Sequence, residues 1–316
     1  MDSEPYLQRL TAQLIDAVDR LPIDFRRRHA AWIKLRQNPD GGFSGREGGS
    51  DLYYTGFAMR SLAVLQELDP ETCESAASFL RNRLNERGGV IDLFSLLVSA
   101  LLVRLGGGPD VFGNAPTGWT DRLAATLEEY RHTDGGYSKS PGGTSGSTYT
   151  TFLVALALEV LQRPIPNPHL VVRFLRTRER NGGFVEIPQM KRAGTNPTAA
   201  AIGTLQILNA LDESTRTATC GYLLKLRDPV DGGLRANDRI PTADLLSTFT
   251  GSWTLSDLGA IDQMDGARTL AFARSLQAAE GGFRGGAWDT GTDVEYTFYG
   301  IGVVALFAGN GNGAHG

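Results

Sequence analysis

The sequence DGGF at residues 40–43 stands between two stretches that have the character of helices. A glycine inside a helix costs about 1 kcal/mol relative to alanine, so a pair of glycines predicts the end of a helix. Similar tetrapeptides return along the chain and organise the whole sequence. They read RGGV at 87–90, DGGY at 134–137, NGGF at 181–184, DGGL at 231–234 and EGGF at 280–283.

The glycine pairs recur with a nearly constant period. Successive first glycines are 47, 47, 47, 50 and 49 residues apart, which indicates structural repeats. In each repeat an amphipathic segment precedes the pair, a loop rich in Gly, Ser and Pro follows it, and a segment with few charges comes last. The first glycines of the six pairs are Gly41, Gly88, Gly135, Gly182, Gly232 and Gly281.

Each repeat therefore predicts a helical hairpin, with an outer helix before the glycine pair and a more buried inner helix after it. Such hairpins cannot bury their apolar faces alone and must stack, as an open solenoid or a closed ring. The segment from residue 300 on is apolar with a glycine-rich tail, unlike a polar capping repeat. We expect an all-α fold, an α/α toroid (α6/α6 barrel) of six hairpins around a central cavity. It would form a single domain over residues 1–316, with an N-terminal helix in residues 1–25.

Composition and charge narrow the classes of partner. The formal net charge is −4 and the pI is about 5.7, which provides no basic surface for nucleic acid. No apolar run approaches the roughly 20 residues that span a bilayer, and the acidic, amphipathic start of the chain is unlike a signal peptide. The two cysteines, Cys73 and Cys220, are far apart and lack metal-ligand spacing. A cytoplasmic protein without a transmembrane segment is expected.

Two columns of residues align when positions are counted from the first glycine of each pair. Sixteen residues on, repeats three to six have threonine, and Thr55 takes this place in the shorter first repeat. Twelve residues on stand Ser147, Gly194, Asp244 and Asp293, with Asp51 in the first repeat. Residues of these types before an apolar helix are typical N-caps. The same residues would also lie on the cavity rim, where helix N-termini favour anions, and both interpretations stay open.

These repeats carry a family resemblance. The last one, GGFRGGAWDTGTDVEYTFYGIGVVALF at 281–307, closely resembles the final repeat of protein prenyltransferase β subunits. The stretch DGGLRANDRIPTADLLSTF at 231–249 resembles the repeat before it. The whole chain is similar to the prenyltransferase and squalene-cyclase repeat superfamily, closest to β subunits of the Rab geranylgeranyltransferase type. The resemblance implies a toroid that handles isoprenoids, and a helical-repeat partner subunit.

The resemblance also locates a zinc site, which this sequence does not reproduce. Asp and Cys of the fifth repeat and His of the sixth would correspond to Asp244, Leu246 and Tyr296. Leucine cannot bind a metal, and tyrosine rarely replaces imidazole or thiolate at zinc. We therefore expect no catalytic zinc and no other metal site, although a diphosphate substrate would admit Mg²⁺.

The terpene-cyclase branch of the superfamily protonates an alkene or epoxide with the middle Asp of Asp-x-Asp-Asp-Thr. The matching stretch here is Asp293-Val294-Glu295-Tyr296-Thr297, which places Glu295 at the general-acid position. A competing interpretation is that Asp293 caps the helix and Glu295 satisfies first-turn N–H groups and the helix dipole. The altered motif and the lack of a second helical domain count against a cyclase. The candidate catalytic residues are Asp293, Glu295, Tyr296 and Asp244.

A prenyl diphosphate would need cations at the rim and an apolar or aromatic wall below them. The resemblance points to loops of the fourth and fifth repeats for the cations, although such residues are usually only solvated. Inner-helix aromatics would supply the wall, although most aromatics in such places belong to the core. The candidate substrate-binding residues are Lys191, Arg192, Arg235, Arg239, Tyr53, Tyr54, Tyr149, Phe249 and Trp253.

Three functions remain open. The first is an isoprenoid-handling protein, similar to a prenyltransferase β subunit, that binds farnesyl or geranylgeranyl diphosphate and acts without catalytic zinc. The second is a terpene cyclase that uses Glu295 or Asp293 as its acid. The third is a non-catalytic toroid that serves as a binding scaffold. The isoprenoid chain length, the acceptor and the oligomeric state are not determined by the sequence.

Overall fold

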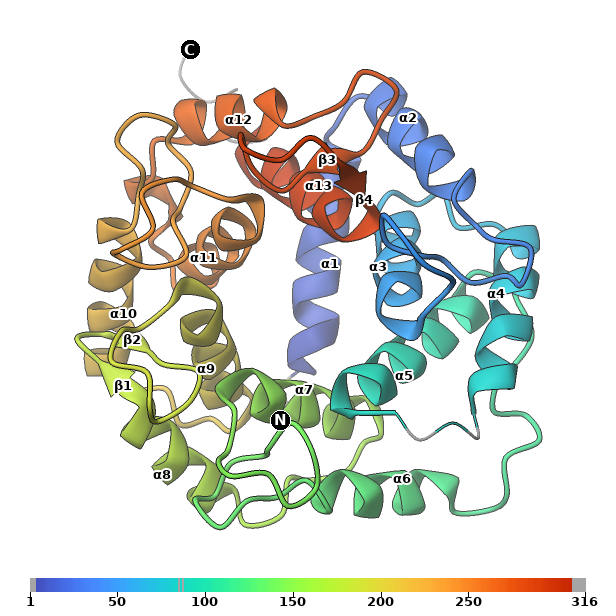
Figure 1. Cartoon of the computed structure of the whole chain (residues 1–316), viewed down its shortest axis with the longest axis horizontal. Helices are drawn as coiled ribbons and strands as arrows, with labels where there is room; N and C mark the ends of the chain where they lie inside the picture. The colour runs from blue at the N-terminus through green and yellow to red at the C-terminus, as the bar shows by residue number, and fades with distance from the viewer. Residues whose placement is uncertain (1–3, 85, 87, 309–316) are drawn as a thin grey trace. The chain divides into compact units, whose positions relative to one another are not determined.

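The computed structural model describes residues 4–84, 86 and 88–308. Within these residues the chain forms 13 α-helices, one short 3-10 helix at Ile261–Gln263 and four strands of two residues each (Figure 1). None of the described helices combines the length and the apolar character needed to cross a bilayer.

After α1 (Tyr6–Asp19), outer helices that precede a glycine pair alternate with inner helices that follow it. The outer helices are α2 (Ile23–Lys34), α4 (Pro70–Arg83), α6 (Trp119–Glu128), α8 (Pro168–Arg178), α10 (Glu213–Lys225) and α12 (Gly266–Ser275). The inner helices are α3 (Leu52–Val64), α5 (Val90–Leu105), α7 (Thr148–Val160), α9 (Thr195–Ile207), α11 (Leu245–Asp257) and α13 (Val294–Ala308).

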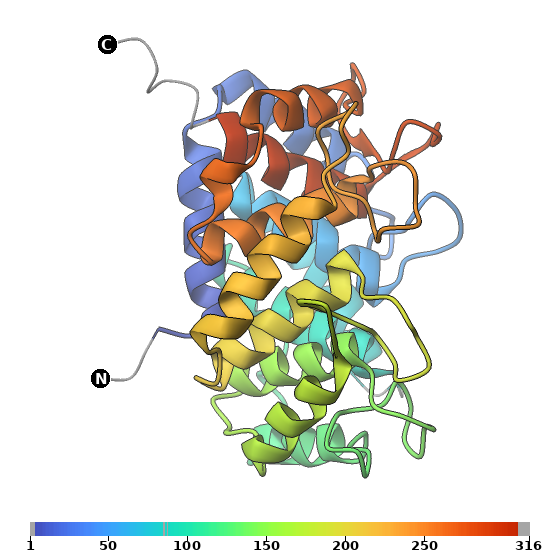
Figure 2. The same cartoon turned by 90° about the vertical axis from the view of Figure 1, so that its left-hand side faces the viewer.

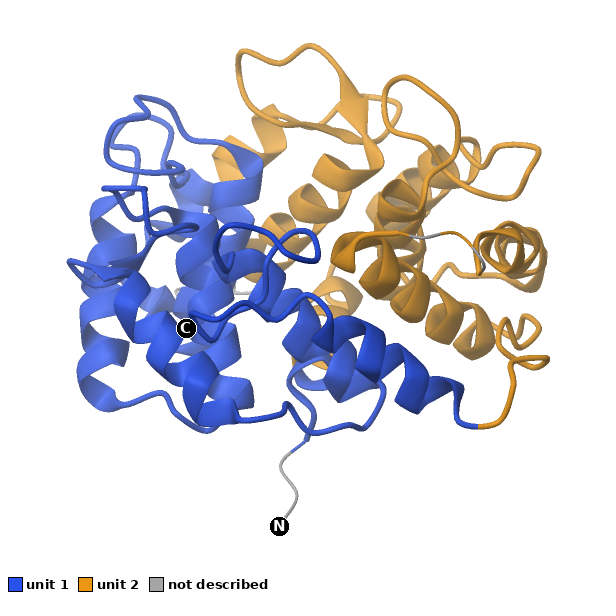
Figure 3. Cartoon of the chain, turned by 60° about the horizontal axis from the view of Figure 1, so that its bottom comes forward, with its two compact units in different colours: residues 1–9, 118–269 blue, residues 10–117, 270–316 orange. Residues whose placement is uncertain are grey.

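The chain divides into two compact units (Figure 3). Unit 1 comprises residues 1–9 and 118–269, and in it α9 packs between α7 and α11. Unit 2 comprises residues 10–117 and 270–316, and in it α3 packs between α13 and α5. Unit 2 therefore places the last hairpin of the sequence directly against the first. The expectation of a single domain over the whole chain stays a prediction.

The first glycine of a pair makes a turn that other residues would resist. Gly135 and Gly182 have φ of +98° and +87°, in the left-handed region. A Cβ on either would also lie 2.4 Å from a backbone oxygen of the next outer helix, that of Leu170 or Ala218. The pair at 88–89 differs, because Gly89 is already the N-cap of α5 and the inner helix begins at once.

The threonine column ties the loop to the inner helix in five of the six described hairpins. Thr151 Oγ1 accepts a hydrogen bond from the amide of Tyr137 at 2.9 Å and donates to the carbonyl of Ser147 at 2.7 Å. Tyr137 is the residue that follows the glycine pair, and its side chain is fully buried. The same amide-to-threonine bond recurs at Thr55, Thr198, Thr248 and Thr297.

A seam joins the sixth hairpin to the first inside unit 2. His29 of α2 is fully buried, and its Nδ1 accepts a hydrogen bond from the Gly282 amide at 3.1 Å. Its ring stacks on Phe283, with centroids 4.9 Å apart. Trp32, also on α2, leaves no room for a side chain at Gly282, where a Cβ would lie 2.5 Å from the indole.

Candidate active site

A cleft of about 720 Å³ lies in unit 2, where the loop before α3 meets the loop before α13. Figure 2 shows both loops projecting toward the same side. The strands β3 (Phe283–Arg284) and β4 (Thr292–Asp293) pair antiparallel and bring the chain to the start of α13. The cleft is lined by Arg46, Glu47, Tyr54, Trp288, Asp289, Thr290, Asp293, Glu295 and Tyr296.

Asp293 is buried at the start of α13, with both carboxylate oxygens engaged. Oδ1 accepts from the Tyr296 amide at 2.8 Å, as an N-cap does, and Oδ2 accepts from Arg46 Nε at 2.9 Å. Burial raises the pKa of Asp293, while the Tyr296 amide and the Arg46 cation oppose the rise. Asp293 therefore acts as a helix cap and also lies on the cleft wall.

Glu295 is held by two phenols. Its Oε1 accepts from the Tyr53 hydroxyl at 2.7 Å and from the Tyr299 hydroxyl at 3.2 Å. Burial raises the pKa of Glu295, and the Asp293 charge adds to the rise, while the Tyr53 hydrogen bond opposes it. The hydrogen bonds of this carboxyl group within the described residues thus go to phenols rather than to first-turn N–H groups.

Aromatic rings pack beside the Glu295 carboxyl group. Phe57 lies edge-on to Tyr53, Phe298 and Tyr299, with ring centroids 5.0, 5.7 and 5.4 Å away. The cluster joins α3 to α13, which are the inner helices of the first and last hairpins. A weakly acidic carboxyl group beside such rings can donate a proton next to surfaces that stabilise positive charge.

Arg46, which the sequence analysis did not single out, connects the two loops. Its Nη1 and Nη2 donate to both oxygens of Asp289, at 2.7 and 2.5 Å, in addition to the bond to Asp293. This pairing is the main cause that lowers the pKa of Asp289 to about 2. Gly291 leaves the space that the guanidinium occupies, since a Cβ there would lie 3.1 Å from it. Nothing in the repeat pattern marks these residues, because they come from opposite ends of the chain.

Asp244, the aspartate of the same column in the fifth repeat, lies in unit 1 as the N-cap of α11. Its Oδ1 accepts from the Ser247 amide and its Oδ2 from the Ser247 hydroxyl, both at 2.7 Å. Burial raises the pKa of Asp244, and the bonds from Ser247 oppose the rise. Both oxygens are thus engaged by the first turn of α11 itself.

The four candidate diphosphate ligands also lie in unit 1 and do not line the cleft. Arg192 pairs with Asp238 at 2.8 Å, and both side chains are exposed. The Arg235 guanidinium donates to the backbone carbonyls of Leu226 and Lys225, at 3.3 Å each. Lys191 and Arg239 are exposed.

The predicted aromatic residues are divided between the two units. Tyr54 lines the cleft and Tyr53 reaches Glu295 from the same turn of α3. Tyr149, Phe249 and Trp253 are half-buried on inner helices of unit 1, where Phe249 and Trp253 lie 6.3 Å apart between centroids.

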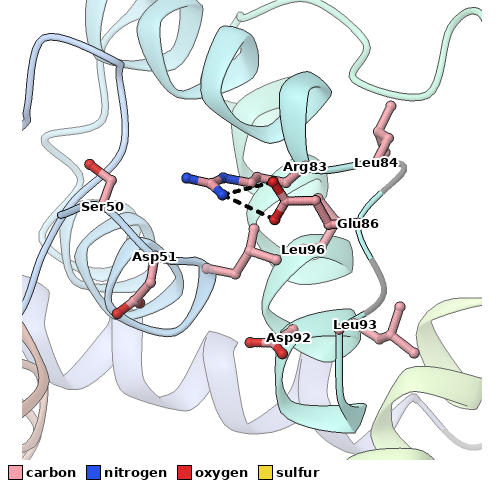
Figure 4. Close-up of a pocket in the computed structure, with 10 residues that line it drawn as sticks. Ser50, Asp51, Arg83, Leu84, Glu86, Asp92, Leu93 and Leu96 are labelled. Carbon is pink, nitrogen blue, oxygen red and sulfur yellow. Dashed lines mark hydrogen bonds and ion pairs between the residues drawn. The ribbon is translucent and has the colours of Figure 1, made fainter.

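A second, smaller cavity of about 190 Å³ lies beside the start of α3 (Figure 4). Arg83 and Glu86 form an ion pair in its wall, with contacts of 2.8 and 3.0 Å. Asp51 and Asp92 also line it, and each carboxylate already accepts a backbone N–H. None of the candidate site residues contributes to this cavity.

The part of the chain that the structure describes contains no group of three or more His, Cys, Asp or Glu side chains arranged to hold a metal ion. Tyr296 stands where the resemblance placed a histidine ligand, with its ring 5.8 Å from the Arg46 guanidinium carbon. The absence of catalytic zinc stays a prediction.

Comparison with known proteins identifies the domain family and the fold of the chain. A family model described as the prenyltransferase alpha-alpha toroid domain matches residues 7–185 and 97–310. Protein geranylgeranyltransferase-I of Candida albicans, complexed with GGPP, superimposes with a TM-score of 0.70 at 15% identity, over 89% of this chain and 90% of that one. No curated protein matches the chain.

Two other solved structures resemble this chain over nearly the full length of both proteins. A variant of the type II terpene cyclase MstE from Scytonema, bound to geranylgeranyl dihydroxybenzoate, has a TM-score of 0.56 at 14% identity, over 93% of this chain and 97% of that one. A glycosidase in complex with glucose has a TM-score of 0.51 at 14% identity, over 98% of each chain. At these identities the likeness concerns the fold alone. The predicted all-α toroid of helical hairpins is confirmed.

Proposed function

The chain belongs to the prenyltransferase alpha-alpha toroid domain family, and from that premise we propose that it is an isoprenoid-handling enzyme of the terpene-cyclase type, with Glu295 as its general acid. The observation that carries the proposal is the setting of Glu295. Its pKa is raised by burial, it lies on the wall of a cleft, and aromatic rings pack beside it. Enzymes tune carboxylic acids in this way when they must be protonated near neutral pH.

The chemistry begins with proton transfer from Glu295. Both phenols donate to Oε1, and no described residue donates to Oε2, so Oε2 is the oxygen that would carry the proton into the cleft. The proton bonds to one carbon of an alkene and leaves a tertiary cation on the other. A second double bond of the same chain attacks that cation and closes a ring. Loss of a proton to water ends the reaction, so the product is an isomer of the substrate, and solvent reprotonates Glu295.

The two phenols act once the proton has been transferred. Because their O–H groups donate to Oε1, they stabilise the carboxylate that remains once the proton has left. The rings of Tyr54 and Tyr296, which line the cleft, would stabilise the developing cation. The proposal therefore assigns the proton to Oε2, charge stabilisation to the phenols, and cation stabilisation to the rings.

Diphosphate-dependent prenyl transfer has less support from the site. The cations predicted for it are exposed, paired with Asp238 or bonded to backbone carbonyls. A second helical domain is not required for the cyclase assignment, because a chain named a type II terpene cyclase is covered almost completely by this one.

Incubation of the full chain with geranylgeraniol or squalene tests the proposal. We expect a cyclic isomer of unchanged mass, detected by gas chromatography with mass spectrometry. Glu295→Gln should reduce its formation by about 10²–10⁴-fold, the usual contribution of a general acid, and Glu295→Asp should retain part of it. Glu128→Gln is the matched control, because Glu128 also accepts a tyrosine hydroxyl, that of Tyr137, but lines neither cavity. Undiminished isomer formation by Glu295→Gln would refute the assignment.

A further inference from the structure

We propose that the cleft in unit 2 selects isoprenoids with an uncharged head group and discriminates against prenyl diphosphates. This inference rests on the proposed function and specifies the substrate class of the same site. It follows from the charges of the described residues that line the cleft, from the contacts of Arg46 among them, and from the exposed aromatic surface of the cleft.

The described wall of the cleft is strongly acidic. Its nine lining residues include four carboxylic acids and a single basic side chain, that of Arg46. With Glu295 protonated, as the proposed reaction requires, three carboxylates still face one guanidinium. A diphosphate carries several negative charges and would be repelled, because like charges a few ångströms apart each cost on the order of 1 kcal/mol even in water.

Arg46 is also held by two carboxylates. One edge of its guanidinium holds both oxygens of Asp289, and Nε holds Asp293. A diphosphate that captured Arg46 would have to displace these carboxylates. Asp293, whose side chain is 6% exposed, would then lose its counter-charge while buried, which is strongly unfavourable.

The same cleft offers a large apolar surface. Trp288 is 60% exposed. Its ring packs against Gly286, where a Cβ would lie 2.4 Å from the indole. The rings of Tyr54 and Tyr296 also face the cleft. An isoprenoid chain can bury apolar surface against these rings without bringing in charge.

Binding of a matched ligand pair tests the inference. Geranylgeraniol and geranylgeranyl diphosphate share one hydrocarbon chain and differ in the head group. We expect the alcohol to bind at least about tenfold more tightly at low ionic strength, a difference of about 1.4 kcal/mol. Titration calorimetry with and without Mg²⁺ would measure it. The ratio should shrink as salt is raised toward about 0.5 M, because exposed charges are then screened.

A charge reversal in the cleft distinguishes the effect of a charge close to the ligand from the effect of the net charge of the protein. Glu47→Lys should tighten binding of the diphosphate several-fold, and should change binding of the alcohol much less. Glu74→Lys changes the net charge equally, but its side chain is exposed on α4 and lines neither cavity, so it should change the ratio less than about twofold. Equal effects of the two variants, or tighter binding of the diphosphate by the wild-type chain in either Mg²⁺ condition, would overturn the inference.

The two proposals fail separately. If the wild-type chain cyclises geranylgeraniol but binds the diphosphate as well as the alcohol, the head-group inference is wrong and the function of Glu295 stands. If Glu295→Gln forms the isomer as the wild type does, the proposed function is wrong whatever the head-group preference.

Discussion

At the scale of single residues, one column of the repeat holds side chains with different surroundings. Asp244 and Asp293 are both N-caps at the same offset from a glycine pair. Among the described residues, Asp244 bonds only within the first turn of α11, whereas Asp293 also bonds to Arg46 and stands two residues before Glu295. A shared position in the repeat therefore predicted the cap, but it could not distinguish the cleft from an ordinary helix start.

Tyr53 should set the acidity of Glu295. Its hydrogen bond favours the carboxylate, so Tyr53→Phe should raise the pKa of Glu295 further. Turnover requires the protonated acid and is lost as pH rises through that pKa. The descending limb of the profile of kcat/KM against pH should therefore move to higher pH. Tyr299→Phe removes a longer bond, 3.2 rather than 2.7 Å, and should move it less. A limb that moves to lower pH would contradict this role.

The ionised carboxylate of Asp289 should stabilise the fold at neutral pH, and this stabilisation should be lost in acid. Its pKa in the folded chain, about 2, lies below its usual value, so its contribution is present above about pH 4 and is lost as pH falls toward 2. Asp289→Asn should cost about 1 kcal/mol at pH 7, a modest value because the Arg46 side chain is 37% exposed. Urea unfolding should show the wild-type and variant stabilities converging near pH 2. A constant difference from pH 7 to pH 2 would argue against the ion pair as its source.

At the scale of elements, five of the six described hairpins are fastened by one buried threonine. In repeats three to six the hydroxyl accepts a hydrogen bond from the amide of the residue after the glycine pair and donates one to the carbonyl of the N-cap residue. The sequence revealed this column as a spacing without a role. The contacts explain it, because a buried N–H that lacks an acceptor is costly to leave unpaired.

Thr151→Val tests this fastening with little change of volume. The amide of Tyr137 would lose its acceptor in the interior, so the variant should lose about 1–3 kcal/mol of unfolding free energy. Thr151→Ser keeps the oxygen and should lose less. Thr126→Val, at an exposed hydroxyl on α6, serves as the control and should stay within about 0.5 kcal/mol of the wild type. Chemical denaturation would compare the variants, and equal losses for Val and Ser at position 151 would exclude the hydrogen bond as the cause.

At the scale of the whole chain, the seam between the last and first hairpins depends on a neutral histidine. Burial, with Arg28 nearby, lowers the pKa of His29 to about 3. The unfolded chain binds a proton below about pH 6.5 and the folded chain does not, so stability is present above pH 6.5 and is lost progressively as pH falls toward 3. The loss of unfolding free energy caused by His29 should reach about 2–3 kcal/mol near pH 4.5.

His29→Gln isolates this effect. The variant should be less stable at pH 7, because glutamine fills the stacked site beside Phe283 poorly. Its stability should then fall less than that of the wild type between pH 7 and pH 4.5. Urea unfolding at several pH values provides both curves, and parallel curves would show that His29 does not titrate on unfolding.

The sequence by itself determined the repeat, the hairpins, the turns and the caps. These features depend on local chemistry, such as glycine at positive φ, an N-cap before an apolar helix, or a threonine at a fixed offset, and most repeats share them. The departures from the family's zinc ligands, Leu246 and Tyr296, could also be read directly. Glu295 was found the same way, as one side chain in an aligned motif.

Only the tertiary structure decided what surrounds Glu295. Tyr53 reaches it across 242 residues of sequence, and Arg46 reaches Asp289 and Asp293 across 243 and 247. A periodic pattern cannot predict such contacts, because it describes every repeat alike and does not specify which side chains meet across the seam. They form because the last hairpin packs against the first, so that loops from the two ends of the chain share one cleft.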